Sequence, residues 1–115
     1  MPTVAITGAA GAIGSVTAEV FADVGWDLAL IDYGADNKAT LDTAFPDAQT
    51  VDCDLTDEES AREAFAALGD AGPLDAVLGI AGGFAMQPAP EATMEDYHHM
   101  VDVNFRTLFN TARAA

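Results

Sequence analysis

Three glycines spaced three residues apart, Gly8, Gly11 and Gly14, follow a short β-branched segment that begins at Thr3. A strand, a glycine turn and a helix in this order are typical of a cradle for a pyrophosphate. Gly8 can take the positive φ of a tight turn, Gly11 lets the backbone approach the phosphates, and Gly14 lets the helix pack closely on the strand. N–H groups at the helix start would face the anion. The pattern therefore predicts a dinucleotide site.

Asp32 closes the second predicted strand, 18 residues after Gly14. A carboxylate at this place can accept hydrogen bonds from both hydroxyls of an adenosine ribose, and it would repel a 2′-phosphate. No arginine follows Asp32, and Gly11 offers no basic side chain. The residues therefore favour NAD over NADP, the alternative being an ordinary solvated aspartate on an acidic protein.

The chain alternates predicted strands and helices, which implies a parallel sheet with helices on its faces. We expect strands at 3–7, 28–32, 49–53 and 74–81, and helices at 13–24, 38–45, 56–68 and 93–115. The strand at 74–81 is apolar enough to be buried on both faces. With no linker and no internal repeat, residues 1–115 are expected to form a single α/β domain.

Apolar spacing predicts which helix faces are buried. A capping box, with Thr56 as N-cap and Glu59 reaching back, should open the third helix. In the first helix, the expected buried face consists of Ile13, Val16, Thr17, Val20, Phe21 and Val24. In the third helix it consists of Ala61, Ala64, Phe65 and Leu68. In the last helix it consists of Tyr97, Val101, Phe105, Leu108, Phe109 and Ala112.

The chain carries 19 acidic and 4 basic residues, a net charge of −15. Such a surface repels nucleic acid and anionic membranes, so we expect neither as a partner. The charge indicates either a merely acidic protein or adaptation to high salt, where screening removes self-repulsion. Cys53 is the only cysteine, which excludes an internal disulfide and fits the cytoplasm. The pair His98-His99 lacks the partners of a metal site, and none is expected.

Four segments together resemble the N-terminal half of a short-chain dehydrogenase/reductase. Thr7-Gly8 through Gly14 resembles the glycine motif of that family, and Cys53-Asp54-Leu55 resembles the acidic segment after its third strand. Ala81-Gly82 resembles the end of the family's Asn-Asn-Ala-Gly motif, and Val103-Asn104-Phe105 resembles the segment carrying the asparagine of the catalytic tetrad. The resemblance covers essentially the whole chain.

The resemblance implies a Rossmann-type three-layer α/β/α fold, half of a doubly wound domain, with strands in the order 3-2-1-4. It implies hydride transfer between NAD(H) and an alcohol or carbonyl substrate in a longer enzyme, with Asn104 as catalytic residue. It also implies the residues that would bind the cofactor, namely Gly8, Gly11, Ile13, Gly14, Asp32, Tyr33, Asp54, Leu55, Ala81 and Gly82.

The chain departs from the family pattern in three ways. Glycine at 11 with alanine at 12 is closer to the extended subfamily of nucleotide-sugar epimerases. Gly79-Ile80 replaces the usual asparagine pair, which removes side-chain bonds from strand four. The family's catalytic serine and Tyr-x-x-x-Lys motif are absent, because Tyr33 is followed at 37 by asparagine and Tyr97 by Val101.

We therefore expect this chain alone not to transfer hydride, and to be a shortened part of a longer enzyme. A naturally short product and a designed half-domain are the alternatives. An epimerase-like parent and a non-catalytic dinucleotide-binding or interaction module are the alternative functions. Without a fifth strand, strand four would be an open edge, so we expect a homo-oligomer formed through this strand or the C-terminal helix.

Overall fold

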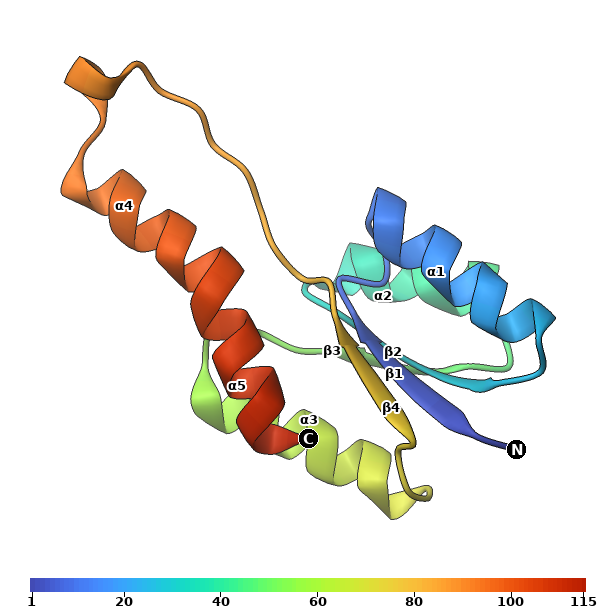
Figure 1. Cartoon of the computed structure of the whole chain (residues 1–115). Helices are drawn as coiled ribbons and strands as arrows, with labels where there is room; N and C mark the ends of the chain where they lie inside the picture. The colour runs from blue at the N-terminus through green and yellow to red at the C-terminus, as the bar shows by residue number, and fades with distance from the viewer.

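The computed structural model describes all residues from 1 to 115, which form a parallel sheet with helices on both faces (Figure 1). The strands are β1 (Thr3–Thr7), β2 (Asp27–Asp32), β3 (Gln49–Asp52) and β4 (Ala76–Gly79). They lie in the order β3-β2-β1-β4, as predicted. This order leaves β3 and β4 as the two edges of the sheet.

Helices join the strands as crossover connections, because parallel neighbours cannot be joined by a hairpin. Helices α1 (Ala12–Asp23) and α2 (Ala35–Ala44) cover one face of the sheet. Helices α3 (Glu58–Asp70) and α5 (Thr107–Ala114) cover the other (Figure 1). The strands therefore lie in the middle of three layers.

The two central strands bury side chains on both faces. Val4, Ile6, Leu28 and Leu30 belong to the core beneath α1 and α2. Ala5, Ala29 and Ile31 point the other way, into the core shared with α3. Burial on both faces is why these segments contain nearly continuous apolar residues instead of alternating with polar ones. In α3, all four residues predicted to be buried are buried: Ala61, Ala64, Phe65 and Leu68.

The buried face of helix α1 is only partly the predicted one: Phe21 packs against the core and Thr17 is half-buried, but the other four predicted residues are exposed. Gly14 and Ala18 are its buried residues, whereas Ile13, Val16, Val20 and Val24 are 56–71% exposed. A Cβ atom on Gly14 would lie only 2.1 Å from the carbonyl oxygen of Gly8. The start of α1 therefore lies so close to the glycine turn that no side chain fits at position 14, and the β-branched row turns outward.

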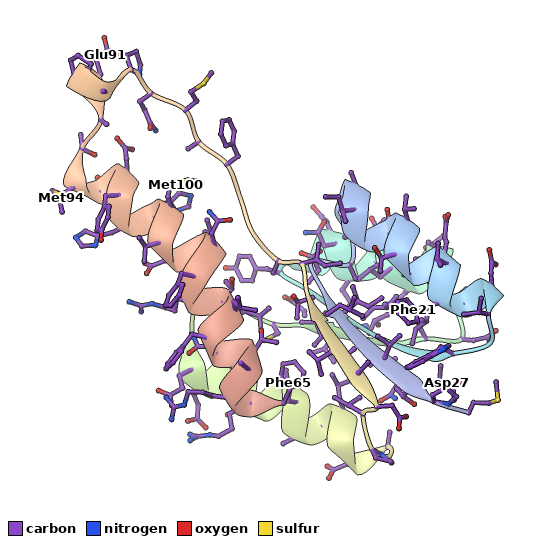
Figure 2. The ribbon with its side chains drawn as sticks, viewed as in Figure 1. Phe21, Asp27, Phe65, Glu91, Met94 and Met100 are labelled. Carbon is purple, nitrogen blue, oxygen red and sulfur yellow. The ribbon has the colours of Figure 1, made fainter.

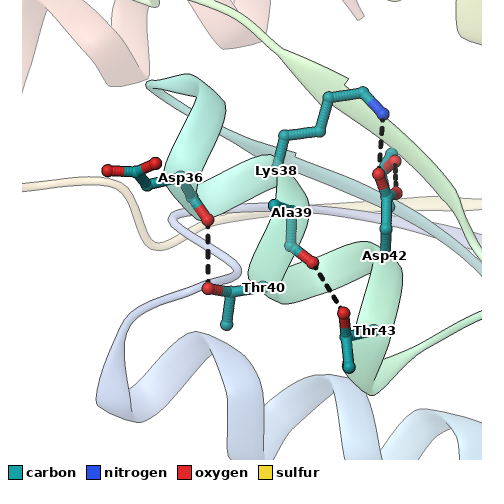
Figure 3. Close-up of polar contacts among 7 residues, drawn as sticks. Asp36, Lys38, Ala39, Thr40, Asp42 and Thr43 are labelled. Atoms are coloured by element: carbon teal, nitrogen blue, oxygen red, sulfur yellow. Dashed lines mark hydrogen bonds and ion pairs between the residues drawn. The ribbon is translucent and has the colours of Figure 1, made fainter.

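Helix α2 depends on polar contacts because only Leu41 on it is buried. Lys38 forms an ion pair with Asp42 at 3.0 Å, and the hydroxyl of Thr50 on β3 donates to the same carboxylate (Figure 3). Thr40 and Thr43 donate to helix carbonyls one turn earlier. The Asp42 cluster therefore fastens α2 to the edge strand.

The N-cap of α3 differs from the prediction. Asp57, not Thr56, accepts hydrogen bonds from the N–H groups of Glu59 and Ser60. The hydroxyl of Thr56 instead donates to Asp54 at 2.6 Å. Both residue types can cap a helix, and here the aspartate one position later is the one that reaches the N–H groups at the helix start.

Strand β4 is shorter than predicted and is not buried on both faces. It covers Ala76–Gly79, and Val77 is 37% exposed. Ala76 and Leu78 still pack against the core beneath α1. An edge strand pairs on one side only, here with β1, so its outer side lacks the neighbour that complete burial requires.

The chain after β4 leaves the sheet as an arm and returns along one long helical segment (Figure 1). The arm holds a 3-10 turn at Ala89–Glu91 and α4 (Met94–Val101), which continues through a π-helical stretch, Asp102–Arg106, into α5. Glu91, Met94 and Met100 lie on this arm, away from Phe21 and Phe65 in the body (Figure 2).

The apolar face predicted for the last helix is not buried. Phe105, Leu108 and Phe109 are 51–65% exposed, and Tyr97, Val101 and Ala112 are exposed too. The helix instead buries Thr107, Asn110 and Thr111. Asn110 donates to the Leu55 carbonyl at 2.9 Å. The contact between α5 and α3 is close, so it selects short side chains that can satisfy their polar atoms locally.

Candidate functional site

The carboxyl ends of the strands surround a cavity of about 580 Å³. Ligands of open α/β sheets bind in the crevice at this edge, where the strand order reverses. Here β1 has β2 as its neighbour on one side and β4 on the other, so the strand order reverses between β1 and β4. The ten residues predicted to bind a dinucleotide all line this one cavity: Gly8, Gly11, Ile13, Gly14, Asp32, Tyr33, Asp54, Leu55, Ala81 and Gly82.

The glycine turn makes unequal demands on its three glycines. Gly8 has a φ of +66°, and a Cβ atom there would lie 2.8 Å from the backbone of Ala81. A side chain at position 14 would collide with the Gly8 carbonyl. Gly11 has an ordinary φ of −75°, and its Cβ would lie 3.3 Å from the same carbonyl oxygen. Internal packing therefore explains Gly8 and Gly14 fully, and Gly11 only weakly.

Helix α1 begins on this turn with unpaired donors. The N–H groups of Ala12, Ile13 and Gly14 donate to no acceptor within the chain, and Gly11 offers no capping side chain. Asp57 and Thr93 cap α3 and α4, by contrast. A helix start that combines free N–H groups with the positive end of the helix dipole can bind an anion.

Asp32 lies at the end of β2, facing the glycine turn. Its Oδ2 accepts the N–H of Ala10 at 2.8 Å, and its Oδ1 accepts the N–H of Tyr33 at 2.7 Å. The amide of Asn37 also donates to Oδ1, at 3.2 Å. These bonds hold the carboxylate at the cavity wall in one orientation.

Asn37 is a cavity residue that the sequence analysis missed. It lies in the first turn of α2, whose N-cap residue, Gly34, has no side chain to cap the helix. A polar residue one turn after a strand-ending aspartate was the available signal, since it can reach back toward that aspartate. Thr56 also lines the cavity, where it donates to Asp54 through both its N–H and its hydroxyl.

Cys53 closes the cavity beneath Asp54. Its side chain is 3% exposed, and burial raises the pKa of the thiol above its usual 9.0. Ser60 touches the sulfur at 3.4 Å and also accepts the N–H of Asp54 at 3.1 Å. A thiol held in its protonated form is a poor nucleophile, so Cys53 serves as a wall residue.

The end of β4 is fastened by Thr7, whose hydroxyl oxygen accepts the N–H groups of Ile80 and Ala81 at 3.0 and 3.1 Å. Thr7 is 1% exposed. Although Gly79-Ile80 lacks the side-chain amides of an asparagine pair, the strand end keeps two side-chain contacts through this threonine. A Cβ atom on Gly79 would meet Leu108 at 2.8 Å, so α5 occupies the space beside it.

Asn104 does not line the cavity and instead anchors its rim. Its Oδ1 accepts the N–H of Gly83 at 3.1 Å, and its Nδ2 donates to the carbonyls of Gly83 and Met100, both at 3.0 Å. It lies within the π-helical stretch, a feature often found at functional sites. A Cβ atom on Gly82 would lie 2.6 Å from the Asn104 oxygen.

Charge in the cavity is entirely negative. Asp32 and Asp54 are the only charged residues that line it, and no lysine, arginine or histidine does. An anionic ligand would therefore be held by backbone N–H groups and the helix dipole, against the carboxylates and a net charge of −15. No three His, Cys, Asp or Glu side chains gather as a metal site, and no helix is long and apolar enough to cross a membrane.

Comparison with solved structures supports the same architecture. A short-chain dehydrogenase/reductase of Burkholderia xenovorans superposes with a TM-score of 0.91 at 26% identity, covering 100% of this chain and 51% of that one. A metagenomic blue fluorescent protein in complex with NADPH gives 0.89 at 25% identity, covering 99% and 49%.

Sequence relatives cover the same portion. Serine 3-dehydrogenase of Rhizobium radiobacter is 33% identical over 94% of this chain and 45% of its own length. An oxidoreductase of Mycobacterium tuberculosis is 36% identical over 98% and 43%. The chain thus spans about half the length of these relatives. The short chain dehydrogenase family model matches residues 2–115. The chain therefore belongs to the short-chain dehydrogenase family and has its NAD(P)-binding fold.

Proposed function

We propose that this chain binds the adenosine and pyrophosphate parts of a nicotinamide dinucleotide, NAD in preference to NADP. In a protein of its relatives' length, it would be the cofactor half of an oxidoreductase acting on an alcohol or carbonyl substrate. The nicotinamide ring of such a cofactor supplies hydride acceptance and donation. This chain contributes the residues that would hold and orient the adenosine and pyrophosphate parts of the cofactor.

One observation carries the proposal: the three free N–H groups at the start of α1 lie on the same cavity as the Asp32 carboxylate. The first set suits a pyrophosphate, and the carboxylate suits ribose hydroxyls. Gly8 and Gly14 lack side chains that would collide with backbone in the turn at the start of α1. The residues present therefore fit the dinucleotide that the family implies.

The preference for NAD rests on charge. A 2′-phosphate would lie beside Asp32, and no basic residue on the cavity wall could neutralise it. One structural neighbour binds NADPH, but it shares only 25% of its residues with this chain. We propose that the uncompensated carboxylate makes this chain select the hydroxyl form.

We do not expect the chain alone to catalyse hydride transfer, because it has no Tyr-x-x-x-Lys sequence. Asn104 is the one tetrad residue that the resemblance assigns here. Its contacts to Gly83 suggest that it acts by holding the loop after β4 beside the cavity.

Isothermal titration calorimetry with AMP, NAD and NADP, at molar KCl, tests the proposed binding. We expect NAD and AMP to bind and NADP to bind more weakly. Asp32→Ala should weaken NAD binding by about 1–3 kcal/mol and reduce the discrimination against NADP. Asp36→Ala, which removes a carboxylate from α2 outside the cavity, is the matched control. Tighter binding of NADP, or no binding of any nucleotide, would refute the assignment.

We propose further that the chain self-associates through β4 or the C-terminal helix. The outer side of β4 has no partner strand, and Phe105, Leu108 and Phe109 form an exposed apolar row. Unpaired strand edges and apolar patches of this kind favour association. Light scattering at high micromolar concentration should detect a dimer. Val77→Lys should disrupt only pairing through β4, and Phe109→Lys only packing through the helix; a monomer in the wild type would refute the proposal.

A further inference from the structure

Asn37 is an exposed residue that lines the cavity, and its amide carries a hydrogen-bond acceptor that no contact in the chain uses. Its Nδ2 donates to the Tyr33 carbonyl at 2.8 Å and to Oδ1 of Asp32 at 3.2 Å. A side-chain amide nitrogen has two hydrogens, so both are committed. The amide oxygen accepts no hydrogen bond in the chain, and the residue lines the cavity.

The orientation of this amide is fixed by its neighbours. Both partners of the nitrogen, the Asp32 carboxylate and the Tyr33 carbonyl, can only accept hydrogen bonds. Turning the amide over would place its oxygen against these two oxygens and lose both bonds. The free atom of Asn37 is therefore an acceptor, and it stays an acceptor while Asp32 is ionised.

Asp32 alone has little capacity left for a diol. An ionised carboxylate has about four acceptor positions. The N–H groups of Ala10 and Tyr33 and the amide of Asn37 already occupy three of them. Two ribose hydroxyls that both donate to Asp32 would have to displace one of these bonds. A second acceptor beside the carboxylate removes that conflict.

We propose that Asn37 is a specificity-determining residue of the dinucleotide site, and that its amide oxygen accepts one ribose hydroxyl while Asp32 accepts the other. This inference rests on the dinucleotide binding proposed above. Two adjacent acceptors select a ligand that brings two donors. A 2′-phosphate brings only acceptor oxygens and negative charge, so it is rejected by both residues rather than by Asp32 alone.

Deoxynucleotides separate this role from a purely structural one. If Asn37 only steadies Asp32 or α2, its removal weakens AMP, 2′-deoxy-AMP and 3′-deoxy-AMP by the same factor. If it accepts a hydroxyl, its removal costs nothing for the analogue that lacks that hydroxyl. The comparison lies within one variant, so a change in its folding stability cancels.

The experiment measures the affinities of wild type and Asn37→Ala for the three nucleotides by calorimetry at molar KCl, with thermal melting to confirm folding. Asp36→Asn, an exposed neighbour outside the cavity, is the control. We expect Asn37→Ala to weaken AMP about five- to tenfold, as for one lost hydrogen bond, and to leave one deoxy analogue unchanged.

Equal weakening of all three nucleotides, or no weakening of AMP, would overturn the role of Asn37 and leave the proposed function standing. A wild-type chain that binds none of the three would overturn the proposed function and this inference with it. The two failures are therefore distinguishable from the wild-type titrations alone.

Discussion

Replacing Gly14 by alanine tests the close contact between the start of α1 and the glycine turn. The added Cβ would lie 2.1 Å from the Gly8 carbonyl oxygen, 2.8 Å from its carbon and 2.9 Å from the Cα of Ala9. All three atoms belong to backbone, so no side chain can rotate away. Either the glycine turn or the start of α1 has to move.

The expected loss follows from two opposing effects. Alanine is better than glycine inside a helix by about 1 kcal/mol. Overfilling a packed contact costs about 1–3 kcal/mol and more where backbone must shift. With contacts this short to backbone atoms of the turn, we expect a net loss of about 2 kcal/mol in the free energy of unfolding. With an unfolding entropy of about 2.1 cal/mol/K per residue, that lowers the melting temperature of a chain of this length by roughly 8 °C.

Thermal and urea unfolding measured by circular dichroism provide the assay, with two other glycines as controls. Gly11→Ala should change stability little, because its Cβ would lie 3.3 Å from the nearest atom outside its own chain neighbours. Gly69→Ala, in α3 with open space around it, should stabilise the fold by up to about 1 kcal/mol. If Gly14→Ala unfolds at the same temperature as Gly11→Ala, the close approach of α1 to the glycine turn is not what excludes a side chain.

Other predictions concern charge and protonation. A net charge of −15 should raise the melting temperature by several degrees between low salt and molar KCl, and a flat profile would contradict a self-repulsive surface. AMP affinity should also rise with salt, opposite to a site built on lysine and arginine, because only carboxylates line the cavity. The hydrogen bond from Thr50 and, to a smaller extent, the one from Lys38 lower the pKa of Asp42 below its ordinary value of 3.8. The stability that these contacts give the fold is therefore present above pH 3.8 and is lost as the pH falls through the pKa of Asp42 in the folded chain. The stability difference between wild type and Asp42→Asn should shrink in acid, and a constant difference would exclude this linkage. Cys53 should react with a disulfide reagent far more slowly in the folded chain than in urea, because burial protects the thiol and raises its pKa.

The family resemblance supplied the strand order, whereas the glycine turn and Asp32 could be predicted from local features of the sequence. Gly8 needs a positive φ, and Asp32 is the last residue of a largely apolar strand. The carboxyl ends of parallel strands meet at one edge, so residues after separate strands converge there once the strand order is known. Convergence of this kind needs no knowledge of side-chain packing.

Choices between neighbouring residues could not be predicted in the same way. Thr56 and Asp57 can both cap a helix, and only the path of the chain after β3 decides which reaches the free N–H groups. Asn110 and Thr111 look solvated in sequence, yet α5 buries them because it lies against α3 and the Leu55 carbonyl. Tertiary contacts settle these cases, and periodicity carries no information about them.

The face of α1 is different, because the signal for it was present in the glycine turn. Once Gly14 is assigned to the contact with the strand, a turn of about 100° per residue places Ala18 and Phe21 within roughly 40° of it. Val16 and Val20 then fall more than roughly 100° away, on the outer side. The structure follows this geometry, with Ala18 buried and the two valines 56–58% exposed. Counting apolar residues correctly included Phe21, which packs against the core, but it also placed Ile13, Val16, Val20 and Val24 on the buried side, where they are not found. In a helix that follows a glycine turn, the last glycine of the turn is therefore a better guide to the buried face than hydrophobicity.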